Sequence, residues 1–258
     1  MTPFVQQFGE QQVAGFFLVL ARVSPLFVLA PLFSSQLLPP RVRGIVAVAL
    51  AIGLVPVVAR ERIPLETFQF AGLVGKELLV GLGFAFALGA LFAALSVAGT
   101  FLDTSIGFSF GSIVDPITGS SAAVLAQLYA LIGVLIFIAI GGDAWVIQGL
   151  ARTYELVPLE AFPSLGSMTS GALTAFVGIF GAAIQVAGPV MLALILTDAA
   201  FGMVSRVVPQ LNVFAVGFAA KIVVGLLVLG VTLPFIAGWL NDALEASVTD
   251  ALRMLKVA

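Results

Sequence analysis

Residues 103–121 read DTSIGFSFGSIVDPITGSS, and they separate two apolar segments, residues 78–102 and 122–140, neither of which contains a charged residue. Glycine tolerates positive φ at little steric cost, and a residue that precedes proline is pushed away from helical geometry. Because the stretch holds three glycines and the pair Asp115-Pro116, it cannot simply continue either flanking helix. It predicts an irregular, glycine-jointed loop between two membrane-grade helices, and we name residues 103–121 the central segment.

The composition of the whole chain predicts an all-α, polytopic integral membrane protein. Hydrophobic residues make up 61% of the 258 residues and charged residues make up 9%, whereas soluble domains carry about 25% charged residues. This composition leaves too little polar surface to cover a water-soluble globule. The net charge is -2 and there is no run rich in Lys or Arg, so we expect membrane lipid around the chain and no nucleic-acid partner.

Cysteine and histidine are both absent from the sequence. Their absence removes disulfides, thiolate nucleophiles, Cys/His metal sites and haem-binding histidines, together with the commonest general base at neutral pH. Residues 107–111 match the G-x-S-x-G pattern of serine hydrolases, but that mechanism needs a histidine base. We therefore expect no catalytic residue, no cofactor and no bound metal.

About six long apolar segments are predicted to form helices, some of them broken or re-entrant. The segment at residues 45–59 has only 15 residues, so as a helix it would reach ~22 Å, which is less than the ~30 Å thickness of the hydrocarbon core. We expect it to pack inside protein or to span only part of the bilayer. The six segments are residues 13–33, 45–59, 71–102, 122–140, 172–197 and 213–240.

Two further patterns concern packing. Small residues recur at intervals of four at Gly81, Ala85, Gly89 and Ala93, and such stripes let helix backbones approach closely in membranes. Residues 241–258 form an amphipathic tail, in which the apolar residues fall on one side of a helix and the charges on the other. The apolar residues of this tail are Leu244, Val248, Leu252 and Leu255.

Eight ionisable residues lie within or beside the apolar segments, where charges are costly and are usually functional or paired. One interpretation is a proton or ion path, as in a secondary transporter whose coupling sites are Asp103 and Asp198. Each of these two aspartates closes a long apolar span and is followed four residues later by glycine, a weak sign of an internal repeat. The other interpretation is that the charges lie at span ends or pair with charges of neighbouring chains. It is favoured because most of them lie close to a glycine or proline. The eight are Arg22, Lys76, Glu77, Asp103, Asp143, Asp198, Arg206 and Lys221.

Phe108 and Phe110 of the central segment also have two interpretations. Side chains two residues apart in an extended loop point the same way, so both rings could occlude one aperture, and hydrophobic constrictions block pores by dewetting. Alternatively, the two rings anchor the loop in lipid or in neighbouring helices. The residues alone do not decide between the two.

Three regions of the sequence together resemble the FliR family of flagellar export-gate proteins and its injectisome relatives. The first runs from RVSP at residues 22–25 to LPPRVR at residues 38–43. The second is the central segment, from GFSF at residues 107–110 to VDP at residues 114–116. The third has the pattern Asp198-x-x-x-Gly202-x-x-x-Arg206-x-x-Pro209-Gln210-Leu211-Asn212 and reaches Lys221.

This resemblance implies a subunit of a type III protein-export channel rather than an enzyme. It implies a chain similar to a fusion of FliP and FliQ, one membrane-embedded unit over residues 1–258, with a FliP-like part at 1–170 and a FliQ-like helical hairpin and tail at 171–258. One copy would join several copies of FliP and FliQ in a pore complex. FlhB and FlhA would act alongside it in the inner membrane at the flagellar basal body, and flagellar proteins would be exported.

The resemblance also implies roles for particular residues. It implies that the central segment is a plug in the pore, which favours occlusion by the two phenylalanines. The charges become candidates for pairing, within the chain or between subunits. The implied plug residues are Gly107, Phe108, Ser109, Phe110, Gly111, Asp115 and Pro116, and the implied pairing residues are Arg22, Lys76, Glu77, Asp198, Arg206 and Lys221.

Overall fold

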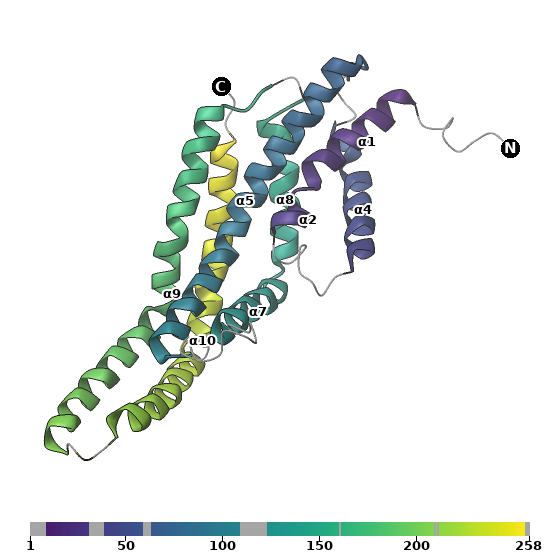
Figure 1. The fold of residues 1–258 in the computed structure, drawn as a ribbon. Helices are drawn as coiled ribbons and strands as arrows, with labels where there is room; N and C mark the ends of the chain where they lie inside the picture. Colours follow the sequence, from purple (N-terminus) through teal and green to yellow (C-terminus); the bar gives the residue numbers. More distant parts are fainter. Residues whose placement is uncertain are drawn as a thin grey trace, which may run out of the picture. The chain divides into compact units, whose positions relative to one another are not determined.

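The computed structural model describes residues 9–30, 39–58, 63–108, 123–159, 161–208, 210 and 212–255. These described residues form eight α-helices and no β-strand (Figure 1). The helices are α1 (Glu10–Val23), α2 (Leu26–Leu29), α4 (Pro40–Val58), α5 (Thr67–Ile106), α7 (Val124–Ala139), α8 (Gly142–Leu156), α9 (Leu165–Val207) and α10 (Val213–Met254).

The lengths and composition of these helices confirm the all-α, polytopic membrane class. Four helical stretches in the described part of the chain are long and apolar enough to cross a membrane, namely Glu10–Leu29, α5, α9 and Ala215–Met254. The broken pair of α7 and α8 raises the number to five if the pair counts as one span. About six segments were expected, and the difference is α4, which covers the short segment at residues 45–59 and is not among these spans.

The chain divides into two compact units. Unit 1 comprises Met1–Ala90, Gly141–Phe176 and Leu244–Ala258, and unit 2 comprises Leu91–Ile140 and Val177–Ala243. Helices α5, α9 and α10 each contribute residues to both units. The expected FliP-like and FliQ-like parts on either side of residue 170 concern a likeness to other proteins, and they stay a prediction.

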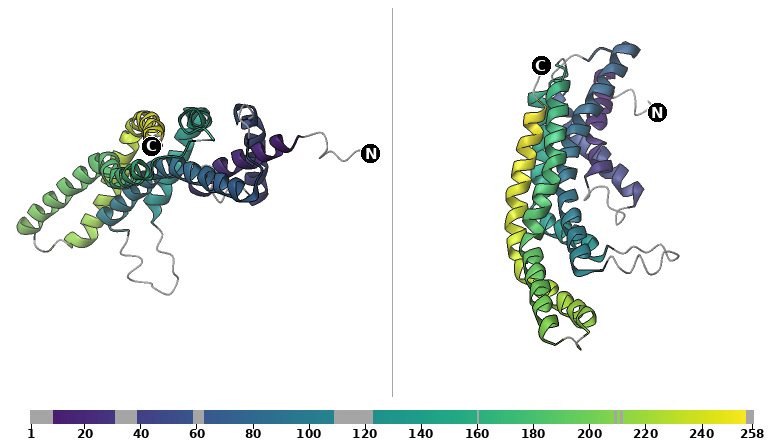
Figure 2. Two further views of the ribbon diagram at one scale, coloured as in Figure 1. Left: turned by 90° about the horizontal axis from the view of Figure 1, so that it is seen from above. Right: turned by 60° about the vertical axis from the view of Figure 1, so that its left-hand side comes forward.

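In unit 1, the small-residue stripe of α5 packs against α1 and α2, which lie beside it (Figures 1 and 2). A Cβ atom at Gly81 would collide with the backbone of Arg22 near the end of α1, and one at Gly89 would lie 3.1 Å from the carbonyl oxygen of Leu29. Ala85, between the two glycines, is fully buried. The stripe therefore lets α5 approach the backbone of its neighbours closely, as such stripes do in membrane proteins.

Residues 241–254 of the amphipathic tail are the last part of α10, and most of the apolar residues of the tail lie in the core of unit 1. Leu244, Val248 and Leu255 are buried, and so is Met254. The charged residue Arg253 on the other side is exposed and pairs with Asp250 at 3.3 Å. The tail thus completes the packing of unit 1.

In unit 2, α5 and α7 form an antiparallel pair. The rings of Phe92 and Phe137 meet edge to face with their centroids 5.5 Å apart. Further along α5, Gly99 lies directly against the backbone of Ala126 at the start of α7. The unit 2 parts of α9 and α10 run side by side as a helical hairpin (Figure 2), in which the indole N–H of Trp239 donates to Gln185 Oε1 at 3.2 Å.

Candidate functional site

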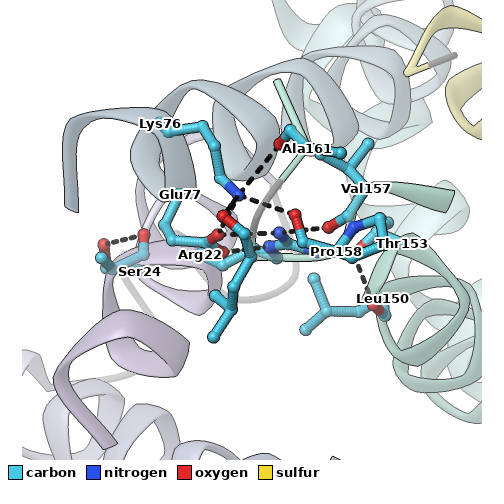
Figure 3. A network of polar contacts seen from close by, with 11 residues as sticks. Arg22, Ser24, Lys76, Glu77, Leu150, Thr153, Val157, Pro158 and Ala161 are labelled. Carbon is cyan, nitrogen blue, oxygen red and sulfur yellow. Dashed lines mark hydrogen bonds and ion pairs between the residues drawn. The ribbon is translucent and has the colours of Figure 1, made fainter. Parts of the chain in front are cut away.

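A buried cluster of charges in unit 1 is built around Arg22 of α1 and Glu77 of α5. Both side chains are completely buried. The guanidinium group donates through Nε to Glu77 Oε2 and through Nη2 to Glu77 Oε1, the second bond at 2.9 Å. This two-pronged geometry is the strongest arrangement of an arginine and a carboxylate. We name Arg22, Lys76, Glu77 and the groups that they contact the charge cluster (Figure 3).

The remaining donors of Arg22 reach the end of α8 (Figure 3). Nη1 donates to the hydroxyl of Thr153 at 3.2 Å, and Nη2 donates to the carbonyl of Val157 at 2.9 Å. The guanidinium carbon also lies 3.9 Å from the ring centroid of Tyr154, a distance at which the cation is attracted by the ring. One arginine therefore ties α1, α5 and α8 together.

Lys76 of α5 extends the charge cluster to the chain that follows α8. Its ammonium group donates to the carbonyls of Pro158 and Leu159, both at 2.8 Å, and of Ala161 at 3.1 Å. It also lies 3.3 Å from Glu77 Oε1. The cluster holds two cations and one carboxylate, and carbonyls near a helix C-terminus supply the rest of the negative potential. Since all three ammonium donors have acceptors, the arrangement holds structure together and leaves Lys76 unsuited to bind a ligand.

A second polar site in unit 2 lies where α5 ends and α7 begins. The irregular loop was predicted to start at Asp103, but residues 103–106 form the last turn of α5, and the first break from helical geometry is at Gly107. Asp103 is buried, and its carboxylate accepts the backbone N–H groups of Leu125 at 3.0 Å and of Ala126 at 3.1 Å. Gly107 has a φ of 103°, in the left-handed region that favours glycine, and its N–H donates to the carbonyl of Asp103 at 3.1 Å. Phe108 follows and is half-buried.

Lys221 of α10 makes polar contacts with both the end of α5 and α9. Lys221 Nζ lies 2.7 Å from Asp198 Oδ1. The same ammonium group donates to the carbonyl of Ser105 at 3.4 Å. The Asp198 side chain is 57% exposed and that of Lys221 is 21% exposed. We name the contacts of Asp103 with α7, and of Lys221 with Ser105 and Asp198, the stem contacts.

Comparison with known proteins identifies the family. Residues 13–247 match the family described as "Bacterial export proteins, family 1". The chain belongs to this family. Similar curated proteins include the flagellar biosynthetic protein FliR of Bacillus subtilis (strain 168), 32% identical over 218 residues, which are 83% of this chain and 84% of the relative. FliR of Escherichia coli (strain K12) is 30% identical over 223 residues, 86% of this chain and 85% of the relative.

The similar proteins also include one with a different name. The surface presentation of antigens protein SpaR of Shigella sonnei is 29% identical over 204 residues, which are 79% of this chain and 78% of the relative. The resemblance to the FliR family, drawn from three regions of the sequence, is confirmed.

The structure brings most of the predicted pairing residues together in two groups. Arg22, Lys76 and Glu77 meet in the charge cluster, and Asp198 meets Lys221. Arg206 is exposed in the last turn of α9. Asp143 is exposed in the first turn of α8. Pairing of any of these charges with another subunit stays a prediction.

Of the predicted plug residues, only Gly107 and Phe108 are among the described residues. Ser109, Phe110, Gly111, Asp115 and Pro116 lie outside them, and the plug itself stays a prediction. In the described part of the chain, no group of three acidic residues could hold a metal ion.

Sequence reasoning missed the partners of the charges. The partners lie more than 70 residues from the charges that they contact, and nothing in their local sequence marks them. They are Thr153, Tyr154 and the carbonyl groups of Val157, Pro158, Leu159 and Ala161. For Asp103 there was a signal that α7 needs a capping side chain from elsewhere in the chain. The residue before α7 is Ala123, which has no side-chain acceptor for the first N–H groups of the helix.

Proposed function

We propose that this chain is a structural and gating subunit of the type III flagellar protein-export channel in the bacterial inner membrane. The observation that carries the proposal is the family match over residues 13–247, together with FliR relatives aligned over most of their length. The charge cluster supports a structural role, because it is saturated by groups of the chain itself. Export would move a polypeptide past the chain without chemistry on the substrate, so we propose no enzymatic activity.

The helix lengths support membership of a larger assembly. Helix α9 has 43 residues, so it extends ~65 Å along its axis, about twice the ~30 Å hydrocarbon core. Large apolar side chains are exposed from its first residue, Leu165, to its last, Val207. Lipid can cover only about half of this length. The remainder needs protein cover, and we propose that FliP and FliQ supply it around one copy of this chain, with FlhB and FlhA alongside.

The buried shares of the long apolar helices also support membership of a larger assembly. In an apolar 18-residue stretch of α5, 61% is buried, compared with 28% in α9 and 11% in α10. A helix packed mainly by its own chain needs no partner, whereas one with few buried residues in an apolar stretch must be covered further by lipid or by other subunits. The α9–α10 hairpin is therefore the part of the chain that we propose to face FliQ-like partners.

The proposed gating element is the central segment. Gly107, Gly111 and Gly119 would act as hinges, and the rings of Phe108 and Phe110 would seal the closed pore by excluding water. The left-handed φ of Gly107 supports a sharp change of chain direction directly after α5. Displacement of the segment would then open a path for the exported protein.

The alternative function, a secondary transporter, is less well supported by the geometry of its two proposed coupling sites. Both oxygens of Asp103 accept backbone N–H groups. Asp198 is paired with Lys221. A coupling carboxylate must bind and release its ion, whereas the carboxylate of Asp103 is buried and already holds the start of α7.

Co-purification of the tagged chain from its native membrane, followed by measurement of the intact mass, tests the proposed assembly. We expect a large complex with one copy of this chain and several copies of two smaller apolar partners. A stable monomer or a simple homodimer would contradict the proposal and favour the transporter.

The proposed plug has a separate test in the assembled complex. The double variant Phe108→Ala/Phe110→Ala should leak small solutes through the closed channel while the complex still assembles. Phe68→Ala is the matched control, because Phe68 is 92% exposed at the start of α5, and it should not leak. Unchanged conductance in the double variant would exclude the plug.

A further inference from the structure

Helix α7 begins without a capping residue of its own. The first N–H groups of a helix have no partner within it and are usually satisfied by the side chain of the preceding residue. In α7 that residue is Ala123, which makes no such bond. The following N–H groups of Leu125 and Ala126 are instead bound by the carboxylate of Asp103, 22 and 23 residues earlier. A side chain of another helix thus performs the capping.

The same residue also takes part in the end of α5. The main-chain carbonyl of Asp103 accepts the N–H of Gly107, the first residue after the helix. Its carboxylate caps α7 from a position that is 2% exposed. In the described part of the chain, no cation pairs with Asp103. The positive end of the α7 dipole is therefore its counter-charge, and water competes little for the bonds.

Close packing directly beneath Asp103 makes this geometry demanding. Gly99, one turn earlier on α5, lies against the backbone of Ala126, so the two helices are in contact where the carboxylate reaches across. On the same end of α5, Lys221 donates to the carbonyl of Ser105. The end of α5 is consequently held by two side chains, Asp103, which binds the start of α7, and Lys221, which reaches it from α10.

We propose that Asp103 is the positioning residue of the central segment, whose carboxylate holds the start of α7 against the end of α5. This inference rests on the proposed function, since it gives the segment two fixed ends. Loss of the carboxylate releases the start of α7 and lets the closed state leak.

The first test measures amide hydrogen exchange of residues 123–128 in the assembled complex. Asp103→Ala should accelerate exchange at Leu125 and Ala126 about tenfold for each hydrogen bond lost. Asp103→Asn should have a smaller effect, because one amide oxygen remains to accept. Asp103→Glu keeps both acceptors and should exchange more slowly than either. Asp143→Asn is the matched control, an exposed carboxylate in the first turn of α8, and it should change nothing at these amides.

The second test measures solute leak through the same complexes. Leak should increase from Asp103→Glu to Asp103→Asn to Asp103→Ala, in the order of the exchange rates. Unaltered exchange in Asp103→Asn and Asp103→Ala overturns the proposal. Faster exchange without leak also overturns it, provided that Phe108→Ala/Phe110→Ala does leak. If the double phenylalanine variant stays closed, the plug is excluded, and the exchange rates alone decide whether Asp103 holds α7.

Discussion

The charge cluster of unit 1 and the Lys221–Asp198 ion pair of unit 2 use the same kinds of groups in opposite environments. Arg22 and Glu77 are completely buried, and Lys76 is nearly so. Lys221 and Asp198 also form an ion pair, but the aspartate side chain is 57% exposed. A buried pair loses its hydration whether or not a partner subunit is present, whereas an exposed pair changes its energy when something covers it. The first region therefore serves the fold of the chain, and the second is open to the assembly.

Among the changes that test this contrast, removal of Arg22 should destabilise the fold most. Arg22→Ala leaves the carboxylate of Glu77 buried without its two-pronged partner, a change that costs about 3–5 kcal/mol in buried pairs. The thermal unfolding temperature of the purified complex and the amount of folded chain in the membrane would both decrease. Arg253→Ala is the control, since Arg253 belongs to an exposed pair. Equal stability of the two variants would show that the charge cluster does not hold unit 1 together.

Replacement of Lys76 should have a smaller effect. Lys76→Met keeps the length of the side chain but removes the three bonds to the carbonyls of Pro158, Leu159 and Ala161. Buried acceptors without donors cost about 1–3 kcal/mol, partly offset because one of two buried cations is lost. The same unfolding measurement tests this. A loss as large as that of Arg22→Ala would mean that Lys76 stabilises unit 1 as strongly as the pair of Arg22 and Glu77 does.

The exposed ion pair should show the smallest effect on the fold. Asp198→Asn should change the free energy of unfolding of the isolated chain by less than about 1 kcal/mol, as is usual for exposed pairs. A double-mutant cycle with Lys221→Met, measured in the isolated chain and in the complex, sharpens the comparison. We expect a larger coupling in the complex, because a partner would exclude water from the pair. Equal coupling in both states would mean that no subunit covers Asp198.

The fold followed from the sequence where local pattern was sufficient. Charge-free apolar runs predicted the long helices, and the interval of four between Gly81 and Gly89 marked the face of α5 that packs on α1 and α2. The short run at residues 45–59 predicted a helix that packs inside protein or spans only part of the bilayer, and α4 is not among the helices counted as long and apolar enough to cross a membrane. In each case a single segment carries the whole signal, because hydrophobicity, length and side-chain spacing are local properties.

The candidate site could be predicted from the local sequence only in part. Arg22, Lys76 and Glu77 stood out because charges in an apolar chain are rare, but neither their mutual contact nor the role of Thr153 follows from spacing. Asp103 was noted as a possible coupling site, whereas in the structure it caps a helix that begins 21 residues later. Such contacts depend on which helix ends meet, and that depends on packing throughout a unit.

The sequence by itself determined the membrane class, the family, the absence of cysteine and histidine chemistry, and the break at the central segment. Each of these depends on composition or on the order of residues along the chain. Only the tertiary structure decided that Arg22 binds Glu77, that Lys76 is held by carbonyl groups, and that Asp103 caps α7. A buried charge needs a partner, but many candidates satisfy that need along the chain, and only close packing selects among them.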